Sequence, residues 1–182
     1  IIQTLQEKKR IPSQEDESVK ILFQTRDNNF IETVSMVDGD RHTVCLSSQS
    51  GCALDCSFCA TGRLGFGRNL STGEIVDQLI FVRGNMHQPI TNVVFMGMGE
   101  PFHNYENVLN AADIFHSPKG FNLASTRITI STAGLLPQIK QFIKEKRRFK
   151  LAISLNAAND RVRNDIMPVN KKWPIDVLIK AG

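Results

Sequence analysis

The sequence lacks long apolar runs, and it contains few cysteines. None of its 182 residues lies in an uncharged apolar run approaching the roughly 20 residues that a membrane-spanning helix requires, so we expect no membrane segment. It also opens without the basic-then-apolar pattern of a secretory signal, which argues against a secreted, disulfide-stapled scaffold. Hydrophobic residues make up 41% of the chain, enough for one sizeable core rather than two.

The four cysteines are confined to a short stretch, and none follows Cys59. Cys52, Cys56 and Cys59 form a C-x3-C-x2-C pattern, and Cys45 precedes it by seven residues. Three thiolates on one loop can surround a soft metal centre. A zinc ribbon would need a second cysteine pair at a distance, which the sequence does not contain. His42 is the remaining candidate for a fourth zinc ligand.

Strand-like and helix-like segments follow one another along the chain. A polar lead-in, residues 1–17, precedes three strand-like runs that are separated by Asp/Asn/Gly turns, which predicts antiparallel hairpins. Beyond the cysteines, short apolar strands alternate with helices, which predicts a parallel α/β sheet, open or closed into a barrel. The expected strands are 19–24, 30–37, 42–48, 92–96, 127–131 and 150–155. The expected helices are 71–83, 106–115, 135–146, a turn at 160–165 and a last helix that starts at Pro174.

Two further features concern charge. Glu32 shares one strand face with Phe30, Val34 and Met36, and a carboxylate in an apolar row is costly unless it is paired or used. Residues 140–182 contain 11 Lys and Arg against 4 Asp and Glu, a local charge of +7 within a net charge of +4. Such a basic block fits either a polyanion partner or a solvated helix face.

The cysteine spacing is the signature of the radical S-adenosylmethionine (SAM) enzymes. Three cysteines on a cubane of four irons leave one iron open to a small molecule. Phe58 would be the aromatic residue that usually precedes the third cysteine in these enzymes, and we expect it to bind the cofactor, to pack in the core, or both. The segment 97–101, Gly-Met-Gly-Glu-Pro, follows an expected strand and resembles the motif that holds the amino group of SAM.

The sequences of several segments are more similar still to one family. Residues 44–56, 95–101, 130–134 and 151–157 together resemble the RlmN/Cfr family of radical SAM RNA methyltransferases, and the likeness covers about residues 19–182. The resemblance implies a partial (β/α)6 radical SAM barrel, residues 42–182, preceded by a β-hairpin extension, residues 18–41. It also implies a cytoplasmic enzyme that methylates C2 of adenosine in ribosomal RNA and transfer RNA, with a flavodoxin-type protein as its reductant.

The resemblance also assigns roles to individual residues. Cys52, Cys56 and Cys59 match the ligands of a [4Fe–4S] cluster. The positions that match contacts to SAM are Gly99, Glu100, Ser131, Ser154, Leu155 and Asn156, the last of which is His in many members. Glu32 matches the proton acceptor, and burial would raise its pKa toward a useful range; the alternative is an edge-strand glutamate that points into solvent. Cys45 matches a family cysteine near the chemistry, and it can equally be a buried structural thiol.

One residue that the family's reaction needs is absent from the sequence. The reaction passes through a methylated cysteine near the C-terminus, and no cysteine follows Cys59. The apolar pattern at residues 177–182 has also only just begun. We therefore expect that these residues are a piece of a longer protein and that they do not turn over alone.

Three alternatives stay open at this point. A Cfr-type enzyme would methylate C8 of adenosine instead of C2, and ring-proton chemistry suits either position. Another radical SAM enzyme, such as one that acts on a protein, would make the basic block incidental. A zinc-stabilised RNA-binding module would use the cysteines without any catalysis.

Overall fold

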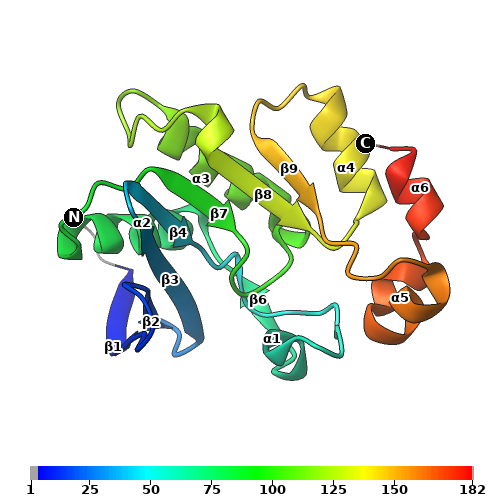
Figure 1. Cartoon of the computed structure of the whole chain (residues 1–182), viewed down its shortest axis with the longest axis horizontal. Helices are drawn as coiled ribbons and strands as arrows, with labels where there is room; N and C mark the ends of the chain where they lie inside the picture. Colours follow the sequence, from blue (N-terminus) through cyan, green and yellow to red (C-terminus); the bar gives the residue numbers. More distant parts are fainter. Residues whose placement is uncertain (1–3, 182) are drawn as a thin grey trace.

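The computed structural model describes residues 4–181 as an α/β fold built on one seven-stranded sheet (Figure 1). The strand order is β1-β2-β3-β4-β7-β8-β9. Neighbouring strands from β1 to β4 are antiparallel, and β4, β7, β8 and β9 are parallel to one another. The strands are β1 Leu5–Pro12, β2 Val19–Thr25, β3 Phe30–Asp38, β4 Arg41–Cys45, β7 Asn92–Phe95, β8 Ile128–Thr132 and β9 Lys150–Ile153.

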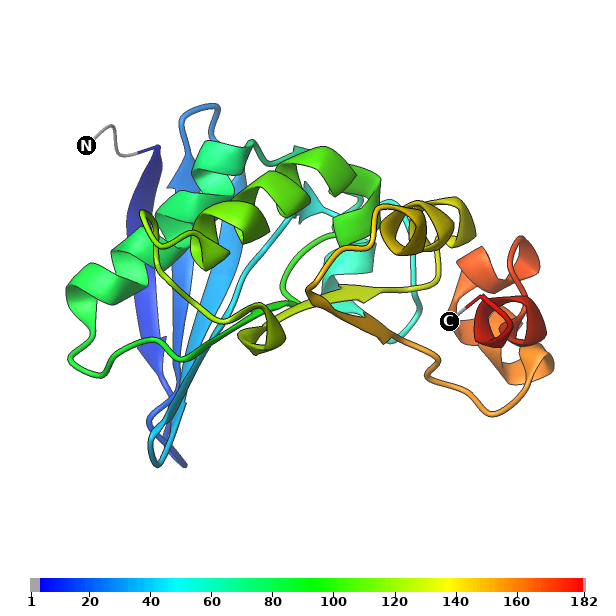
Figure 2. The same cartoon turned by 90° about the horizontal axis from the view of Figure 1, so that it is seen from above.

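Helices connect the parallel strands and cover one face of the sheet. Seen from above, α2, α3 and α4 lie on the same side of the strands, while α5 and α6 lie beyond the end of β9 (Figure 2). The capping box that opens α2 is present, because Ser71 Oγ accepts from the Glu74 N–H and the Glu74 carboxylate accepts from the Ser71 N–H. The helices are α1 Ala60–Arg63, α2 Thr72–Asn85, α3 Tyr105–His116, α4 Leu136–Lys144, α5 Asp160–Ile166 and α6 Ile175–Ile179, with short 3-10 helices η1 Pro101–Asn104, η2 Ser125–Arg127 and η3 Pro168–Lys171.

The first strand corrects the expectation of a loose polar lead-in over residues 1–17. Leu5–Pro12 pairs with β2 along its length, from Leu5 opposite Thr25 to Pro12 opposite Val19. Only Leu5 of this strand is buried. An edge strand held by its backbone ladder needs no alternating apolar pattern, and charged side chains are common on such edges. Residues 1–3 of the expected lead-in lie outside the described residues.

The expectation of a partial α/β barrel is confirmed. Four parallel strands with helices on one face form an open arc, and within the described residues no strand pairs with the outer edge of β9. The antiparallel strands β1–β3 continue the same sheet, as a β-extension would. The division of the chain at residues 17 and 41 stays a prediction. Among residues 4–181 the structure contains no helix long and apolar enough to cross a membrane.

Two smaller differences concern element boundaries. The strand expected over residues 42–48 ends at Cys45, and Gln49–Gly51 forms β5, which pairs with β6, Phe66–Asn69, in a separate two-stranded sheet. Pro174 caps the last helix rather than occupying its first turn. The cysteine loop, residues 52–59, therefore lies between the two strands of a hairpin that the sequence pattern did not predict.

Candidate cofactor site

The cysteine loop lies at the end of the sheet where the parallel strands have their carboxyl termini, with α1 and β6 beneath β7 and β8 and with α5 beside them (Figure 1). Gly51 enters the loop at φ +75°, and a Cβ atom there would meet the carbonyl oxygen of Gly65 at 1.9 Å. The Cys52 N–H donates to that same oxygen over 2.8 Å. Glycine at position 51 thus allows the β5–β6 hairpin to close around the loop.

The three cysteines of the C-x3-C-x2-C pattern line one cavity of about 360 Å³. This volume is typical of a small-molecule site. The strand-end loops contribute Gly99, Glu100, Ser131, Ser154 and Asn156 to the lining of the same cavity. All four cysteines of the chain are free thiols. A soft, three-thiol donor set facing a cavity with polar residues on its far wall fits an iron–sulfur cluster with one open iron.

The donor set fits a zinc ion less well. Within residues 4–181, no group of three His, Cys, Asp or Glu side chains converges on a position that could hold one metal ion. Three thiolates on a cubane each bind a different iron, so they need not converge on a single point. His42 is fully buried in β4, where its ring contacts Ser35 Oγ at 2.8 Å and the carbonyl oxygen of Gln88 at 2.9 Å. Both ring nitrogens are occupied there, so the candidate fourth zinc ligand is excluded.

Burial raises the pKa values of two thiols of the cavity. It raises the pKa of Cys56 to about 11, with Cys52, Cys59 and Glu100 adding to the effect and the positive charge of Arg163 opposing it. Burial also raises the pKa of Cys52. Thiols in such surroundings stay protonated at neutral pH until a metal centre displaces their protons.

The loop after β7 places a carboxylate at the cavity wall. Gly99 has φ +97°, and a Cβ atom there would lie 2.5 Å from the Cβ of Gln49. The side chain of Gln49 accepts a hydrogen bond from the Glu100 N–H over 2.8 Å. The Glu100 carboxylate is 3% exposed and accepts from the N–H groups of Phe102 and Ala133 at 3.0 and 2.8 Å. Burial raises its pKa, and these two donors act in the opposite direction.

The ends of β8 and β9 supply hydroxyl and amide groups. Ser131 Oγ lies 3.1 Å from Ser154 Oγ across the two strands. Asn156 has φ +55°, a conformation that asparagine tolerates better than most residues, and its side-chain amide faces Met167 Sδ at 3.6 Å. A carboxylate and several hydrogen-bonding groups thus line the same cavity as the thiols.

Of Leu155 and Phe58, both expected at the cofactor site, only Phe58 lines the cavity. Leu155 does not line the cavity among the described residues, and its carbonyl oxygen accepts from Arg163 Nε over 2.9 Å. Phe58 lines the cavity but is 57% exposed, so it is not part of the core. Leu155 therefore acts on the site through its backbone, while Phe58 can cover one side of a ligand.

Glu32 corrects the expectation of a buried carboxylate. The buried face of β3 carries Ile31, Thr33 and Ser35, and the face with Glu32 is partly exposed. The Glu32 carboxylate lies 3.1 Å from Lys20 Nζ, and its side chain is 40% exposed. Strand period alone cannot tell which face a sheet turns toward its helices. Here buried hydrogen bonds, such as that of Thr33 Oγ1 to Gln78 Oε1 at 2.8 Å, support the more polar face.

Cys45 lies on the same side of the sheet as Glu32. It is paired with Val34 of β3 and with Val94 of β7, and Val34 follows Glu32 by two residues. Burial raises the pKa of the Cys45 thiol to about 11, against a hydrogen bond from the Met96 backbone. Met96 lines the cavity, whereas Cys45 and Glu32 do not. The structure thus brings these two residues to the helix-free face beside the cavity rather than into its wall.

Sequence reasoning missed two residues that organise the site. Gln49 belongs to the Ser-Ser-Gln run before the cysteines, and its contact with Glu100 depends on a sequence separation of 51 residues. Arg163 is fully buried behind the strand ends, although an arginine on a polar helix normally indicates a solvated face. The density of small polar residues at 47–50 was the only sequence signal, and nothing in the sequence of α5 distinguishes Arg163 from Arg161.

Comparison with known proteins places this geometry among characterised families. The family model described as "Radical SAM superfamily" matches residues 46–181. The chain is 48% identical over 169 residues to "Dual-specificity RNA methyltransferase RlmN" of Syntrophobacter fumaroxidans, a match that covers 92% of this chain and 49% of the relative. It is 45% identical over 169 residues to "Probable dual-specificity RNA methyltransferase RlmN" of Spiroplasma citri, covering 91% and 49%.

A solved structure has the same fold. The crystal structure of a radical SAM methyltransferase from Sphaerobacter thermophilus superposes with a TM-score of 0.91 at 44% sequence identity. The match covers 98% of this chain and 53% of that protein. The chain therefore spans about half the length of the relatives that it matches.

Proposed function

The chain belongs to the radical SAM superfamily, and from this premise we propose that the intact protein methylates C2 of adenosine in large-subunit ribosomal RNA and in transfer RNA. The observation that carries the proposal is its identity of 45–48% with proteins named as dual-specificity RNA methyltransferases, over about nine-tenths of the chain. The resemblance to this family and the expected cofactors, a [4Fe–4S] cluster and SAM, are thereby confirmed. No specific observation favours the C8-directed or protein-directed alternatives.

The cofactor roles follow from the cavity. We assign Cys52, Cys56 and Cys59 as cluster ligands, because all three line the cavity from one loop. When bound, the cluster and SAM together supply one-electron radical chemistry, and the protein supplies position and exclusion of water. Glu100 would accept the ammonium group of SAM, since two backbone donors fix its carboxylate and leave acceptor capacity free.

The far wall of the cavity would hold the rest of SAM. The paired hydroxyls of Ser131 and Ser154 can donate to and accept from polar groups of the ligand. The Asn156 amide, where many family members have histidine, offers a donor and an acceptor at the end of β9. The half-exposed ring of Phe58 and the half-exposed thioether of Met96 would cover the apolar parts of the ligand.

Glu32 would act on the RNA base rather than on SAM, and Cys45 would lie near the same chemistry. Both lie on the helix-free face of the sheet beside the cavity, as the cross-strand pairing of Cys45 with Val34 requires. Glu32 would take the proton from the ring carbon, and Lys20 Nζ lies 3.1 Å from its carboxylate. The methyl-carrying cysteine of the family would follow Cys59, and the 182 residues contain none there. We therefore expect no RNA methylation from these 182 residues alone.

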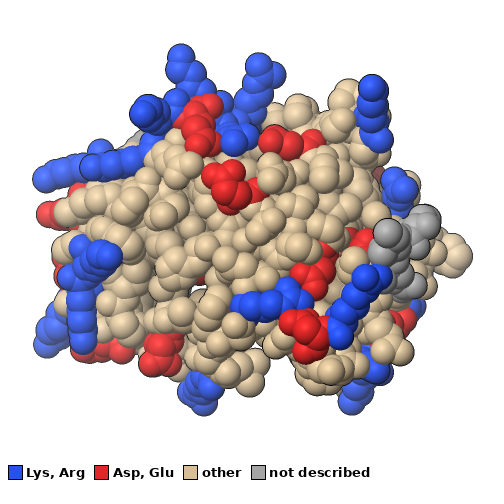
Figure 3. Space-filling view, turned by 180° about the vertical axis from the view of Figure 1, so that it is seen from behind, with Lys and Arg blue, Asp and Glu red and all other residues tan. Residues whose placement is uncertain are grey.

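Partners and location complete the proposal. The relatives are named for action on RNA, and we propose ribosomal and transfer RNA as substrates, a flavodoxin-type protein as the electron donor and the cytoplasm as the location. On the face seen from behind, Lys and Arg side chains are scattered mainly around the rim (Figure 3). Weakening of RNA binding as salt rises would measure how many of them contact phosphates.

The test uses the intact protein, reconstituted with iron and sulfide without oxygen and supplied with a reductant, SAM and ribosomal RNA fragments. We expect adenosine methylated at C2, detected by mass spectrometry of the digested RNA. Methylation at C8 would identify the Cfr-type alternative. SAM cleavage without any RNA methylation would favour a radical SAM enzyme that acts on another substrate.

A further inference from the structure

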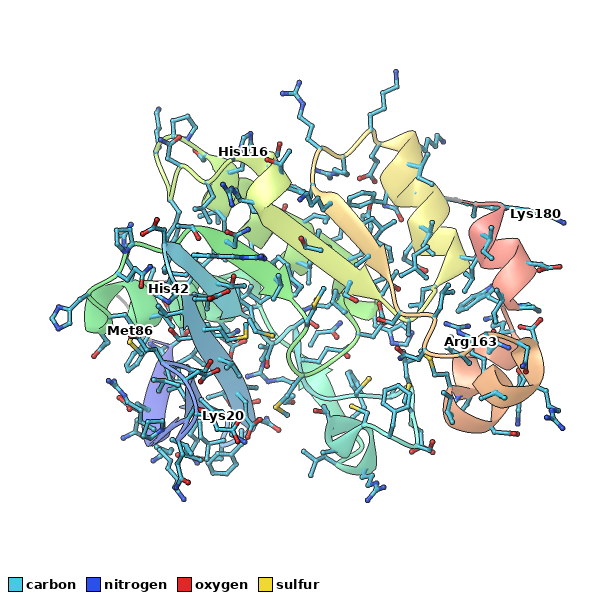
Figure 4. All side chains as sticks on the ribbon, viewed as in Figure 1. Lys20, His42, Met86, His116, Arg163 and Lys180 are labelled. Carbon is cyan, nitrogen blue, oxygen red and sulfur yellow. The ribbon has the colours of Figure 1, made fainter. Side chains whose placement is uncertain are left out.

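Arg163 of α5 is a fully buried cation (Figure 4). Its guanidinium group uses all three nitrogens as donors. Nε donates to the carbonyl oxygen of Leu155 at 2.9 Å, and Nη1 donates to Asn170 Oδ1 at 2.6 Å. Nη2 donates to the carbonyl oxygens of Ala133 at 2.5 Å and Ser154 at 3.1 Å. One side chain thus joins the loops after β8 and β9 to η3.

These contacts lead directly to the cavity wall. The Ala133 N–H donates to the Glu100 carboxylate, and the Ala133 carbonyl oxygen accepts from Arg163. Ala133 therefore links the guanidinium to the carboxylate that we propose binds SAM. Ser154 lines the cavity with its hydroxyl and accepts from Arg163 with its carbonyl. At the end of α5, the carbonyl oxygen of Ile166 accepts from the Ser57 N–H over 3.0 Å, which fastens the cysteine loop to the same helix.

The charge of Arg163 has no direct counterion in the described part of the chain. All four acceptors are neutral oxygens, and no carboxylate between residues 4 and 181 forms an ion pair with it. A buried charge without a partner is costly in a folded protein. Asp160, which Asn170 links to Arg163 by hydrogen bonds to both, and the thiol of Cys56 interact electrostatically with the guanidinium. Cys56 packs with Ala133 and Met167, which places Arg163 beside the cysteine loop.

We propose that Arg163 is a positioning residue of the cofactor site, which fixes the strand-end loops against the cysteine loop and supplies a buried positive charge beside the cluster ligands. The inference rests on the proposed assignment of this cavity to the cluster and SAM. The hydrogen bonds of Arg163 and its positive charge can be tested separately by substitution. A lysine retains the charge but cannot match the planar fork that reaches acceptors on three segments. A methionine removes both the charge and the hydrogen bonds.

The test compares R163K and R163M with R161K and R161M in the cluster-loaded intact protein. Arg161 is an exposed arginine on the same helix, so its variants match the change in charge without touching the cavity. Three quantities are measured for each variant: iron content, the dissociation constant of SAM without turnover, and the reduction potential of the cluster. We expect R163K to weaken SAM binding about tenfold, as loss of the hydrogen bonds that orient binding-site residues does, with a reduction potential close to wild type.

R163M should weaken SAM binding as well and also lower the reduction potential, because a nearby positive charge favours the reduced, more negative cluster. The Arg161 variants should change neither quantity. If R163M or R163K does not fold, as judged by thermal unfolding and iron content, N170A decides, because it removes one acceptor and keeps the guanidinium. N170A should weaken SAM binding by less than R163K.

Two results would overturn the proposal: SAM binding by R163K within twofold of wild type at full iron content, or, where the Arg163 variants do not fold, wild-type SAM binding by N170A. A wild-type protein that takes up no cluster or does not bind SAM would instead overturn the assignment of the cavity, and the role of Arg163 with it.

Discussion

The backbone N–H of Ala133 donates to the Glu100 carboxylate over 2.8 Å, which joins the end of β8 to the loop that follows β7. The second carboxylate oxygen accepts from the Phe102 N–H. Both donors are neutral backbone N–H groups. They hold the carboxylate in place without neutralising its negative charge. A buried carboxylate that is fixed in this way is suited to one cationic ligand.

Replacing this carboxylate should impair SAM binding more than the fold. E100Q retains an oxygen for one backbone donor but turns an amide nitrogen toward the other, and it removes the negative charge. We expect SAM binding to weaken by at least about tenfold, the effect of losing a charge-assisted hydrogen bond, while iron content is retained. Equilibrium binding to cluster-loaded protein measures this, and an unchanged dissociation constant would remove Glu100 from the site.

Gly99 provides a separate test of the same loop. Because its φ is +97° and a Cβ atom would lie 2.5 Å from Gln49 Cβ, G99A should cost about 1–3 kcal/mol in the free energy of unfolding. Gly84 in α2 is the matched control, since a Cβ atom there meets nothing within 4 Å. G84A should stabilise the protein by about 0.5–1 kcal/mol. Denaturant unfolding of both variants checks the pair, and equal effects would contradict the close packing of Gly99.

The ion pairs of Arg68 predict how the free energy of unfolding depends on pH. It pairs with Asp27 at 2.5 Å and with Glu74 at 2.7 Å. The hydrogen bond from Arg68 lowers the pKa of Asp27. For Glu74, burial opposes ionisation, but the bonds from Arg68 and Ser71 outweigh it and lower the pKa.

Groups with depressed native pKa values contribute stability above their unfolded values, here 3.8 and 4.5, and lose it as the pH falls further. The free energy of unfolding should therefore decline below about pH 4.5, and more gradually in R68M than in wild type. Denaturant titrations between pH 6 and 3 measure both slopes. Parallel slopes would show that the Arg68 pairs contribute little to the acid sensitivity.

Glu32 and Lys20 allow a catalytic role to be separated from a structural one. An exposed ion pair of this kind contributes at most about 1 kcal/mol, so neither E32Q nor K20M should unfold the protein. E32Q should abolish RNA methylation by the intact protein while SAM binding and iron content stay at wild-type levels. K20M should retain most of the activity. Full methylation by E32Q would exclude Glu32 as the proton acceptor.

The order of elements and the cysteine site could be predicted because each rests on local signals. Ser71 and Glu74 mark a helix start by their own hydrogen bonds, and the spacing of Cys52, Cys56 and Cys59 carries its chemistry within eight residues. The strand β1 could not be predicted, because a backbone ladder holds it and only Leu5 is buried.

Features that depend on tertiary contacts were the ones missed. The exposure of Glu32 depends on which face of β3 the helices cover, and strand period is the same for either choice. The burial of Arg163 depends on carbonyl oxygens that precede it by 8 to 30 residues. A polar residue at such a position has no signature in sequence pattern, because its partners are backbone atoms.

The most direct measurement is metal analysis and SAM cleavage in the reconstituted wild-type protein beside C56A. Cys56 is a buried member of the three-cysteine loop, and a cluster that loses one of three ligands should not assemble. We expect about four iron atoms per wild-type chain, iron–sulfur absorption and release of 5′-deoxyadenosine under a strong reductant, with all three lost in C56A. Zinc in place of iron, or SAM cleavage that persists in C56A, would contradict the assignment of the cysteine loop as the cluster site.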